Sequence, residues 1–157
     1  MRWSKLRTLV RERLADSVAD RVDIHSARYG ACGCGHAWIT LDGKVIANFC
    51  TRAKYVALGL EPGKPNRKQI YALADFGEFS RQDAYEACWA FVHELSAEQA
   101  LGDEDPLVQS LAMLDRRVGK RRLRALDEAS LHPLARRLLL IRLEAEQGAP
   151  LTSASVA

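Results

Sequence analysis

Three cysteines and a histidine are the residues of this sequence best suited to binding a metal. Cys32, Cys34 and His36 are separated from one another by single residues, within and just after a glycine-rich stretch at residues 30–35. Cys50 lies farther along the chain. A hairpin between them would place His36 beside Cys50, with the other two thiols in the adjoining loop. Thiolates and an imidazole within reach of one another are the ligands that zinc takes in tetrahedral geometry. A one-residue spacer between the cysteines is not the usual two-residue spacer of a zinc knuckle, so buried or free thiols are the alternative interpretation.

A second group of residues could bind an anion or transfer a proton. His25, Arg28 and Tyr29 belong to one expected strand, and His36 begins the next. An Arg can hold an anion at the rim of a sheet, and a His can act as an acid or base near neutral pH. The alternative is a covered strand face, with His25 bonded to the backbone and Arg28 paired with an acid such as Asp23. The G-x-S-x-G, Walker and G-x-G-x-x-G motifs are absent, so these four residues are candidates and no catalytic role is assigned.

The third group is the basic run from Arg116 to Arg124. Residues 1–104 contain 14 Lys or Arg and 14 Asp or Glu, whereas residues 105–147 contain 9 and 6, so the C-terminal part carries the net charge of +3. A helix continuing through Gly119 would align part of the run for phosphate contacts; a helix ending there would fan the charges around a corner and let some pair internally. The expected anion- or nucleic-acid-binding residues are Arg116, Arg117, Lys120, Arg121 and Arg124.

The basic run also has an intramolecular interpretation. It contains no aromatic residues for base stacking, and no helix-turn-helix or RNA-binding signature accompanies it. Arginines that brace two helices against each other would explain the same residues.

The N-terminal elements that must position these groups follow from hydrophobic spacing. Residues 3–18 predict an amphipathic helix with Ser4 as its N-cap. Residues 21–29, 36–41 and 44–51 predict three strands, the last two joined by an Asp42-Gly43 turn. The pattern favours an antiparallel meander with the first helix packed on it.

The rest of the chain is expected to be helical. Short helices are predicted at residues 51–60 and 66–75 and after two capping boxes, Ser80-x-x-Asp83 and Ser96-x-x-Gln99. A weak internal repeat, Asp105-Pro106-Leu107-Val108 against His132-Pro133-Leu134-Ala135, predicts two further helices that each begin with proline. Gly119 is expected to end the first of them.

Length and composition favour an α+β protein with one compact domain. A chain of 157 residues is long enough to bury a core, so residues 1–148 are expected to form this domain, with 1–51 as helix plus meander and 52–148 as the helical part. Residues 149–157 show no pattern and are expected to be a mobile tail. No apolar run has the length of a membrane span, no signal-peptide pattern is present, and four cysteines suit a reducing compartment, so a cytoplasmic location without membrane binding is expected.

Three stretches of the sequence carry a resemblance to known proteins: Arg2-Trp3-Ser4-Lys5-Leu6, then Arg21-Val22, His25-Ser26 and Arg28-Tyr29 with Trp38-Ile39-Thr40-Leu41-Asp42-Gly43, and finally Leu111 to Arg121. With these motifs the chain resembles a small family of uncharacterised bacterial proteins. The family resemblance implies an order of elements and a soluble cytosolic protein, and it implies no mechanism. The two proline-opened helices are similar to HEAT-type repeats.

The sequence therefore favours a non-enzymatic binding or regulatory module for a protein partner or an anionic ligand. The basic C-terminal helical surface would present the binding residues. Two alternatives stay open: a nucleic-acid-binding protein using the basic run, or a small enzyme with a His, Arg and Tyr site on the sheet. No cofactor is required, although zinc would suit the cysteines.

Overall fold

The computed structural model describes residues 1–28, 35–51, 58–59 and 76–148. It has the expected α+β fold, with a three-stranded antiparallel sheet and a mainly helical C-terminal half. The contacts within the chain define two compact units. The helical unit comprises Met1–Arg21 with Ala87–Ala157, and the sheet unit comprises Val22–Glu86. Among the described residues, none of the helices combines the length and the apolar character that crossing a membrane would require.

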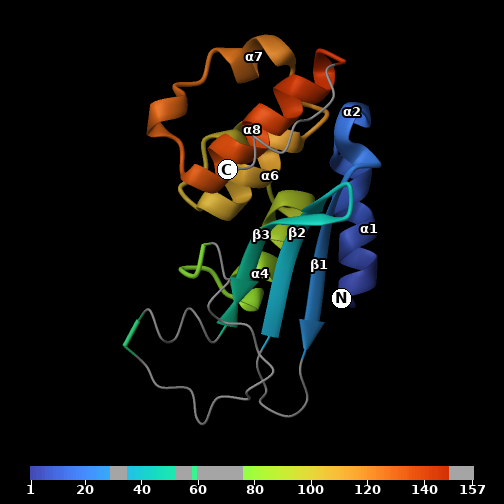
Figure 1. The fold of residues 1–157 in the computed structure, drawn as a ribbon, viewed down its shortest axis with the longest axis vertical. Helices are drawn as coiled ribbons and strands as arrows, with labels where there is room; N and C mark the ends of the chain where they lie inside the picture. The colour runs from blue at the N-terminus through green and yellow to red at the C-terminus, as the bar shows by residue number, and fades with distance from the viewer. Residues whose placement is uncertain (29–34, 52–57, 60–75, 149–157) are drawn as a thin grey trace. The chain divides into compact units, whose positions relative to one another are not determined.

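The sheet unit contains strands β1 (Val22–Arg28), β2 (Gly35–Leu41) and β3 (Lys44–Cys50) in the order β1-β2-β3 (Figure 1). Asp42 and Gly43 join β2 to β3 with φ of 50° and 79°. Positive φ at both central residues is the geometry of a type I′ turn, which matches the right-handed twist of the two strands. The predicted hairpin and meander are therefore confirmed.

One face of the sheet forms the core of this unit. Alternation along the strands places Ile24, Ala37, Ile39 and Phe49 on that face, and all four are buried. The ring of Phe79 meets Phe49 edge to face, with ring centroids 5.8 Å apart. This contact fixes the segment that leads into helix α4 (Arg81–His93), which begins in the sheet unit and ends in the helical unit.

The N-terminal helix is shorter than its hydrophobic pattern predicts. Helix α1 spans Trp3–Arg13 and helix α2 spans Asp16–Ala19, with Leu14 and Ala15 extended between them. The extension arises because the Ala15 N–H donates to the Leu114 carbonyl, at 2.9 Å, in place of a bond within the helix. The predicted single helix was therefore wrong at this point, although Val18 is buried as its spacing suggests.

Local capping was predicted correctly at two helices and wrongly at one. Ser80 and Asp83 exchange hydrogen bonds at the start of α4, and Ser96 and Gln99 form a full capping box at helix α5 (Ala97–Leu101). Ser4 does not cap α1, which starts at Trp3 without a side-chain cap. The Ser4 carbonyl instead accepts from the Thr8 hydroxyl, because Ser4 already lies inside the helix.

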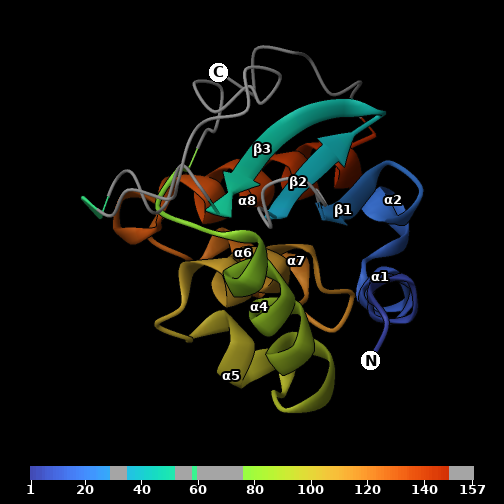
Figure 2. The same ribbon diagram turned by 90° about the horizontal axis from the view of Figure 1, so that it is seen from below.

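Helices α6 (Pro106–Leu114) and α8 (Pro133–Glu146) start in the same way and pack against each other. The Asp105 side chain accepts from the Leu107 N–H, and His132 Nδ1 accepts from the Leu134 N–H. Each proline occupies the first turn, where a missing N–H costs nothing. Helix α5 packs beside α6 (Figure 2). The weak sequence repeat thus corresponds to two helices with matching caps.

The first of these helices ends earlier than predicted. Helix α6 stops at Leu114, Asp115 is its extended C-cap, and Gly119 is instead the N-cap residue of helix α7 (Lys120–Arg124). A short 3-10 helix, η2, spans Glu128–Ser130 before α8. The helices expected at 51–60 and 66–75 lie largely or wholly outside the described residues, as does the tail at 149–157.

Candidate functional site

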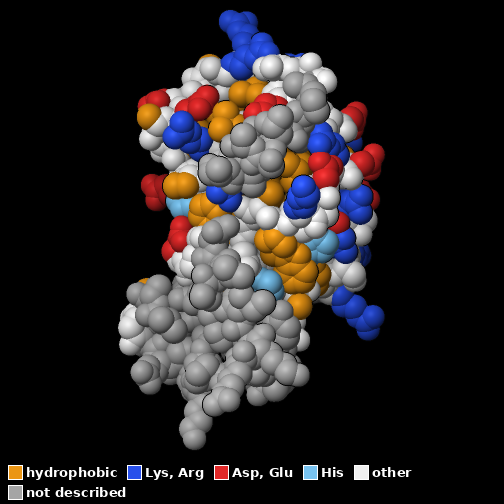
Figure 3. Space-filling view, viewed as in Figure 1, with side chains coloured by type: hydrophobic (Ala, Val, Ile, Leu, Met, Phe, Trp, Pro, Cys, Tyr) orange, Lys and Arg blue, Asp and Glu red, His pale blue; other side chains and the backbone are white. Residues whose placement is uncertain are grey.

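Two imidazoles and an indole form a row on the face of the sheet opposite the core. His25 on β1 is in register with Trp38 on β2, and His36 lies two residues before Trp38 on the same strand. The His25 and Trp38 ring centroids are 5.1 Å apart with an interplanar angle of 11°; for His36 and Trp38 the values are 4.7 Å and 25°. We call these three residues the sheet-face row. All three side chains are half-buried, and Figure 3 shows hydrophobic side chains between histidines over the strands.

Hydrogen bonds orient both imidazoles. His25 Nε2 lies 3.0 Å from the Thr40 hydroxyl, and His36 Nε2 is bonded to Asn48 Oδ1. These contacts, together with the stacking on Trp38, hold both rings in one orientation. The row therefore presents two ordered imidazoles on one face of the sheet.

The structure brings together only some of the residues expected around His25. His36 and His25 share a face, one on each side of Trp38. Arg28 lies an odd number of residues from His25 on β1, so its side chain projects from the opposite face. Tyr29 lies outside the described residues. Trp38 was not among the residues predicted for this site, although its spacing from His36 places both on one face of β2. Its position beside His25 follows from the pairing of β1 with β2.

The expected metal ligands are only partly described. Cys50 is in register with His36, as the hairpin argument requires, and it is a buried free thiol. Cys32 and Cys34 lie outside the described residues. Within the part of the chain that the structure describes, no group of three or more His, Cys, Asp or Glu residues could hold a metal ion.

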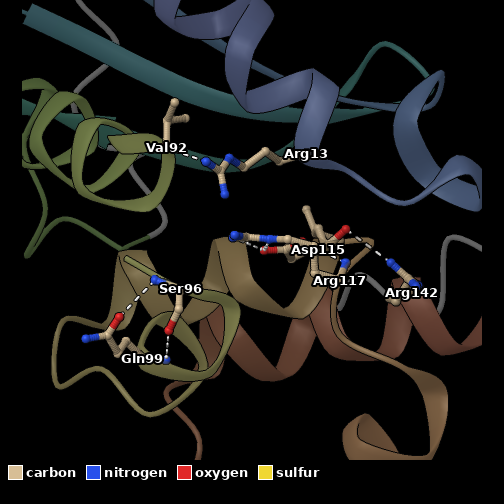
Figure 4. A network of polar contacts seen from close by, with 8 residues as sticks. Arg13, Val92, Ser96, Gln99, Asp115, Arg117 and Arg142 are labelled. Atoms are coloured by element: carbon tan, nitrogen blue, oxygen red, sulfur yellow. Dashed lines mark hydrogen bonds and ion pairs between the residues drawn. The ribbon is translucent and has the colours of Figure 1, made fainter. Parts of the chain in front are cut away.

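The basic run is organised around Asp115, whose side chain is completely buried. Its carboxylate accepts from the Arg117 backbone N–H at 2.8 Å and from Arg117 Nη2 at 2.6 Å (Figure 4). Arg117 Nε also lies about equally close to both carboxylate oxygens, at 3.1 and 3.0 Å. This fork-to-fork pair fixes the bend after α6, because one aspartate satisfies both the backbone and the guanidinium.

Arg142 on α8 ties this bend to the second proline-opened helix. Its side chain is 5% exposed, Nη1 donates to the Leu114 carbonyl at 3.1 Å, and Nε donates to Glu146 at 2.5 Å. Burial lowers the pKa of Arg142, while the charges of Asp115 and Asp16 oppose that shift. The guanidinium of Arg142 is therefore a structural clamp between the C-terminal end of α6 and α8.

The remaining basic residues divide into paired and open groups. Lys120 pairs with Glu146 at 3.1 Å, and Arg122 pairs with Glu98 at 2.8 Å. The helix break means that the basic residues do not form one continuous stripe. Three arginines are exposed and form no ion pair with any described residue; we call them the open arginine set: Arg116, Arg121 and Arg124.

The partner acids of the basic run were not foreseen from the sequence. Glu98 and Glu146 lie far from the run along the chain, and only helix packing brings them to Arg122 and Lys120. Asp115 directly precedes the run and pairs with a residue two positions away. Its pairing is therefore local in sequence, whereas no sequence pattern indicates Glu98 or Glu146.

Comparison with known proteins gives one match. The model of the SF0329 protein family matches residues 2–143, which is most of the chain. No curated protein and no solved structure matches.

Proposed function

We propose that this chain, which belongs to the SF0329 protein family over a region that includes the whole basic run, is a non-enzymatic binding module for an anionic partner. The open arginine set would make the contact. The observation that carries the proposal is the division of the run. Acids of the same unit neutralise Arg117, Lys120 and Arg122, whereas the three arginines of the open set form no ion pair with a described residue.

The paired residues give the open ones a rigid base. Leu123 and Val118 are buried, so α7 is held by apolar contacts as well as by the ion pairs at Lys120 and Arg122. Arg121 and Arg124 are three residues apart on α7 and so share one side of that helix. Because the backbone beneath them is fixed, the entropy that this protein loses on binding an anionic partner would come mainly from the arginine side chains.

An acidic protein segment is the partner that we favour. The run lacks aromatic residues on which bases could stack, so a nucleic acid would be held by phosphate contacts alone. The module would use α6 and α8 as a HEAT-like pair of helices that supports the surface. We also propose a bacterial cytoplasmic location, which suits the buried free thiols of Cys50 and Cys88.

A binding titration with two labelled probes tests this proposal. One probe is an acidic peptide and the other is a DNA duplex, and each is measured at a low and a high salt concentration. The test variant carries Arg116→Gln, Arg121→Gln and Arg124→Gln, and it should weaken peptide binding about tenfold or more at low salt.

The matched control removes the same charge elsewhere in the helical unit. Arg2, Lys5 and Arg11 are exposed on or beside α1, and their replacement by Gln should leave peptide affinity within about twofold. Equal weakening by both triple variants would reduce the effect to net charge and overturn the proposal. Tight binding to DNA with little binding to peptide would establish the nucleic-acid alternative.

A second candidate function is supported by the sheet-face row. Its two half-buried, ordered imidazoles could exchange protons with a ligand at this face, as a small acid–base enzyme requires. Histidine NMR signals of the wild-type protein that shift with a small-molecule library, and lose the shift in His25→Gln, would favour this candidate.

A further inference from the structure

A separate group of hydrogen-bond donors lies where the three strands meet at one end of the sheet. β1 ends at Arg28, β2 begins at Gly35 and β3 ends at Cys50, with Thr51 next (Figure 1). Arg81, the first residue of α4, reaches this end of the sheet on its core face. We call the group of Ser26, Arg28, Thr51 and Arg81 the sheet-end site.

The side chain of Arg81 is held in place by the backbone of β2. A Cβ atom added to Gly35 would lie 2.3 Å from Arg81 Cδ and 2.8 Å from Arg81 Cβ. The aliphatic part of Arg81 therefore packs directly on the strand, where only glycine leaves room for it. Arg81 Nε donates to the Ser26 hydroxyl at 2.7 Å, which sets the direction of the guanidinium.

Arg28 shares this face and this end of the sheet. It is in register with Gly35, and directly opposed residues of an antiparallel pair project their side chains to the same face. Arg81 covers Gly35 on that face, so both arginines lie around the same glycine. Neither of them forms an ion pair with a described residue. Like charges that share one face and one end of a sheet repel each other unless an anion lies between them.

Two hydroxyl groups complete the set of donors. The Ser26 oxygen accepts from Arg81 Nε, and the Thr51 oxygen accepts from the Arg81 backbone N–H at 3.4 Å. Each hydroxyl therefore keeps its own hydrogen for another acceptor. The nearby Asp83 carboxylate is engaged by the Ser80 N–H in the helix cap. The site thus offers two guanidinium groups and two hydroxyl groups, all of them donors.

We propose that the sheet-end site binds the phosphate group of a small phosphorylated molecule. A phosphate dianion matches the charge of two arginines, and its tetrahedral oxygens can accept from guanidinium and hydroxyl groups at once. A carboxylate has one negative charge and two oxygens, so it would leave part of the site unsatisfied. This proposal uses residues of the sheet unit alone and is independent of the open arginine set.

The test is an NMR titration of the full chain with inorganic phosphate at constant ionic strength, with sodium chloride and sodium acetate as reference salts. Phosphate should produce saturable shifts at the Arg81 Nε–H and at the Gly35 and Ser26 amides. Chloride should produce none, and acetate should bind at least about tenfold more weakly. Shifts that are equal for the three salts would overturn the proposal.

Variants separate a built site from general charge. Arg81→Gln and Arg28→Gln should each weaken phosphate binding about tenfold. Gly35→Ala keeps every charge but displaces Arg81, so it should weaken binding to a similar degree. Ser26→Ala provides a second variant without charge change in case Gly35→Ala does not fold. Full phosphate affinity in a folded Arg81→Gln protein would also overturn the proposal.

The result can be distinguished from a failure of the C-terminal binding surface. The triple variant Arg116→Gln, Arg121→Gln and Arg124→Gln should bind phosphate with wild-type affinity at the sheet-end site. Loss of these shifts in that variant would show that phosphate binds at the open arginine set, and it would overturn the assignment of phosphate binding to the sheet-end site.

Discussion

Leu14 and Asp115 form an isolated antiparallel bridge within the helical unit. The Ala15 N–H donates to the Leu114 carbonyl and the Arg116 N–H donates to the Arg13 carbonyl, each at 2.9 Å. The bridge takes up backbone groups that would otherwise continue α1 and α6. Both helices therefore end at this bridge. The basic run begins at the bend that follows, which is held by the bridge and by the pairing of Asp115 with Arg117.

The buried carboxylate of Asp115 should be a principal source of stability for this bend. Asp115→Asn would leave Arg117 without its fork-to-fork partner and weaken the capping of the Arg117 N–H. Losing one partner of a buried pair costs about 3–5 kcal/mol, and since Arg117 is 36% exposed we expect about 2 kcal/mol. Urea denaturation monitored by circular dichroism measures this loss.

Glu98→Gln is the matched control for that measurement. It breaks the ion pair with Arg122, in which both side chains are more than half exposed, so the free energy of unfolding should change by less than about 1 kcal/mol. If the two variants were equally stable, Asp115 would not hold the bend.

Two glycines should respond differently to replacement by alanine. Gly43 has φ of +79° in the hairpin turn, so Gly43→Ala should destabilise the protein by about 1 kcal/mol. Gly119 has φ of −75° and no atom within 4 Å of an added Cβ, so its backbone imposes no strain on alanine. The lower preference for alanine at this N-cap offsets the entropy gained in the unfolded chain, and Gly119→Ala should change stability by less than about 0.5 kcal/mol. Thermal unfolding of both variants checks the prediction, and equal destabilisation by the two substitutions would contradict it.

The cap of α6 should contribute measurably to stability. Asp105→Ala removes the acceptor for the Leu107 N–H and should cost about 1 kcal/mol, whereas Asp105→Asn keeps an acceptor and should cost much less. Chemical denaturation of the two variants separates the hydrogen bond from the loss of side-chain volume. Identical losses in both variants would show that the cap bond itself contributes little.

The buried thiol of Cys88 should make stability depend on pH in the alkaline range. Burial raises the pKa of Cys88 from 9.0 to about 12. The unfolded chain loses this proton at lower pH than the folded chain does, so the contribution of the neutral thiol is present below pH 9.0 and is lost as pH rises toward 12. The slope attributable to Cys88 within this window should approach about 1.4 kcal/mol per pH unit.

A comparison with Cys88→Ala isolates this contribution from other groups that titrate at high pH. The free energy of unfolding of the wild-type protein should fall more steeply with pH than that of the variant, and only above pH 9.0. Parallel pH profiles would show that Cys88 ionises as readily in the folded chain as in the unfolded one.

Features governed by neighbouring residues could be predicted from the sequence. The Asp42-Gly43 turn, the Ser96 capping box and the proline-opened starts of α6 and α8 depend on bonds that span two to four residues. The turn also sets the pairing of β2 with β3 near Lys44, whereas a β-bulge between Ile39 and Thr40 shifts the register by one residue and brings Cys50 opposite His36. The fold class and some residues of each candidate site could be predicted from such short-range patterns.

Contacts between distant segments could not be predicted in the same way. The extended break after Arg13, the end of α6 at Leu114 and the pairing of Lys120 with Glu146 each need a partner far along the chain. Arg81 gave no signal at all, because its position follows from the space above Gly35.

The capping, turn and alternating residues can be identified from the chain alone, since the backbone satisfies those bonds within a few positions. Which charges remain open depends on the packing of distant segments, because a guanidinium is neutralised by whichever carboxylate that packing brings within reach. The hydrophobic pattern along the chain specifies which faces are buried, and it leaves the choice of partner for each face to the packing of the whole unit.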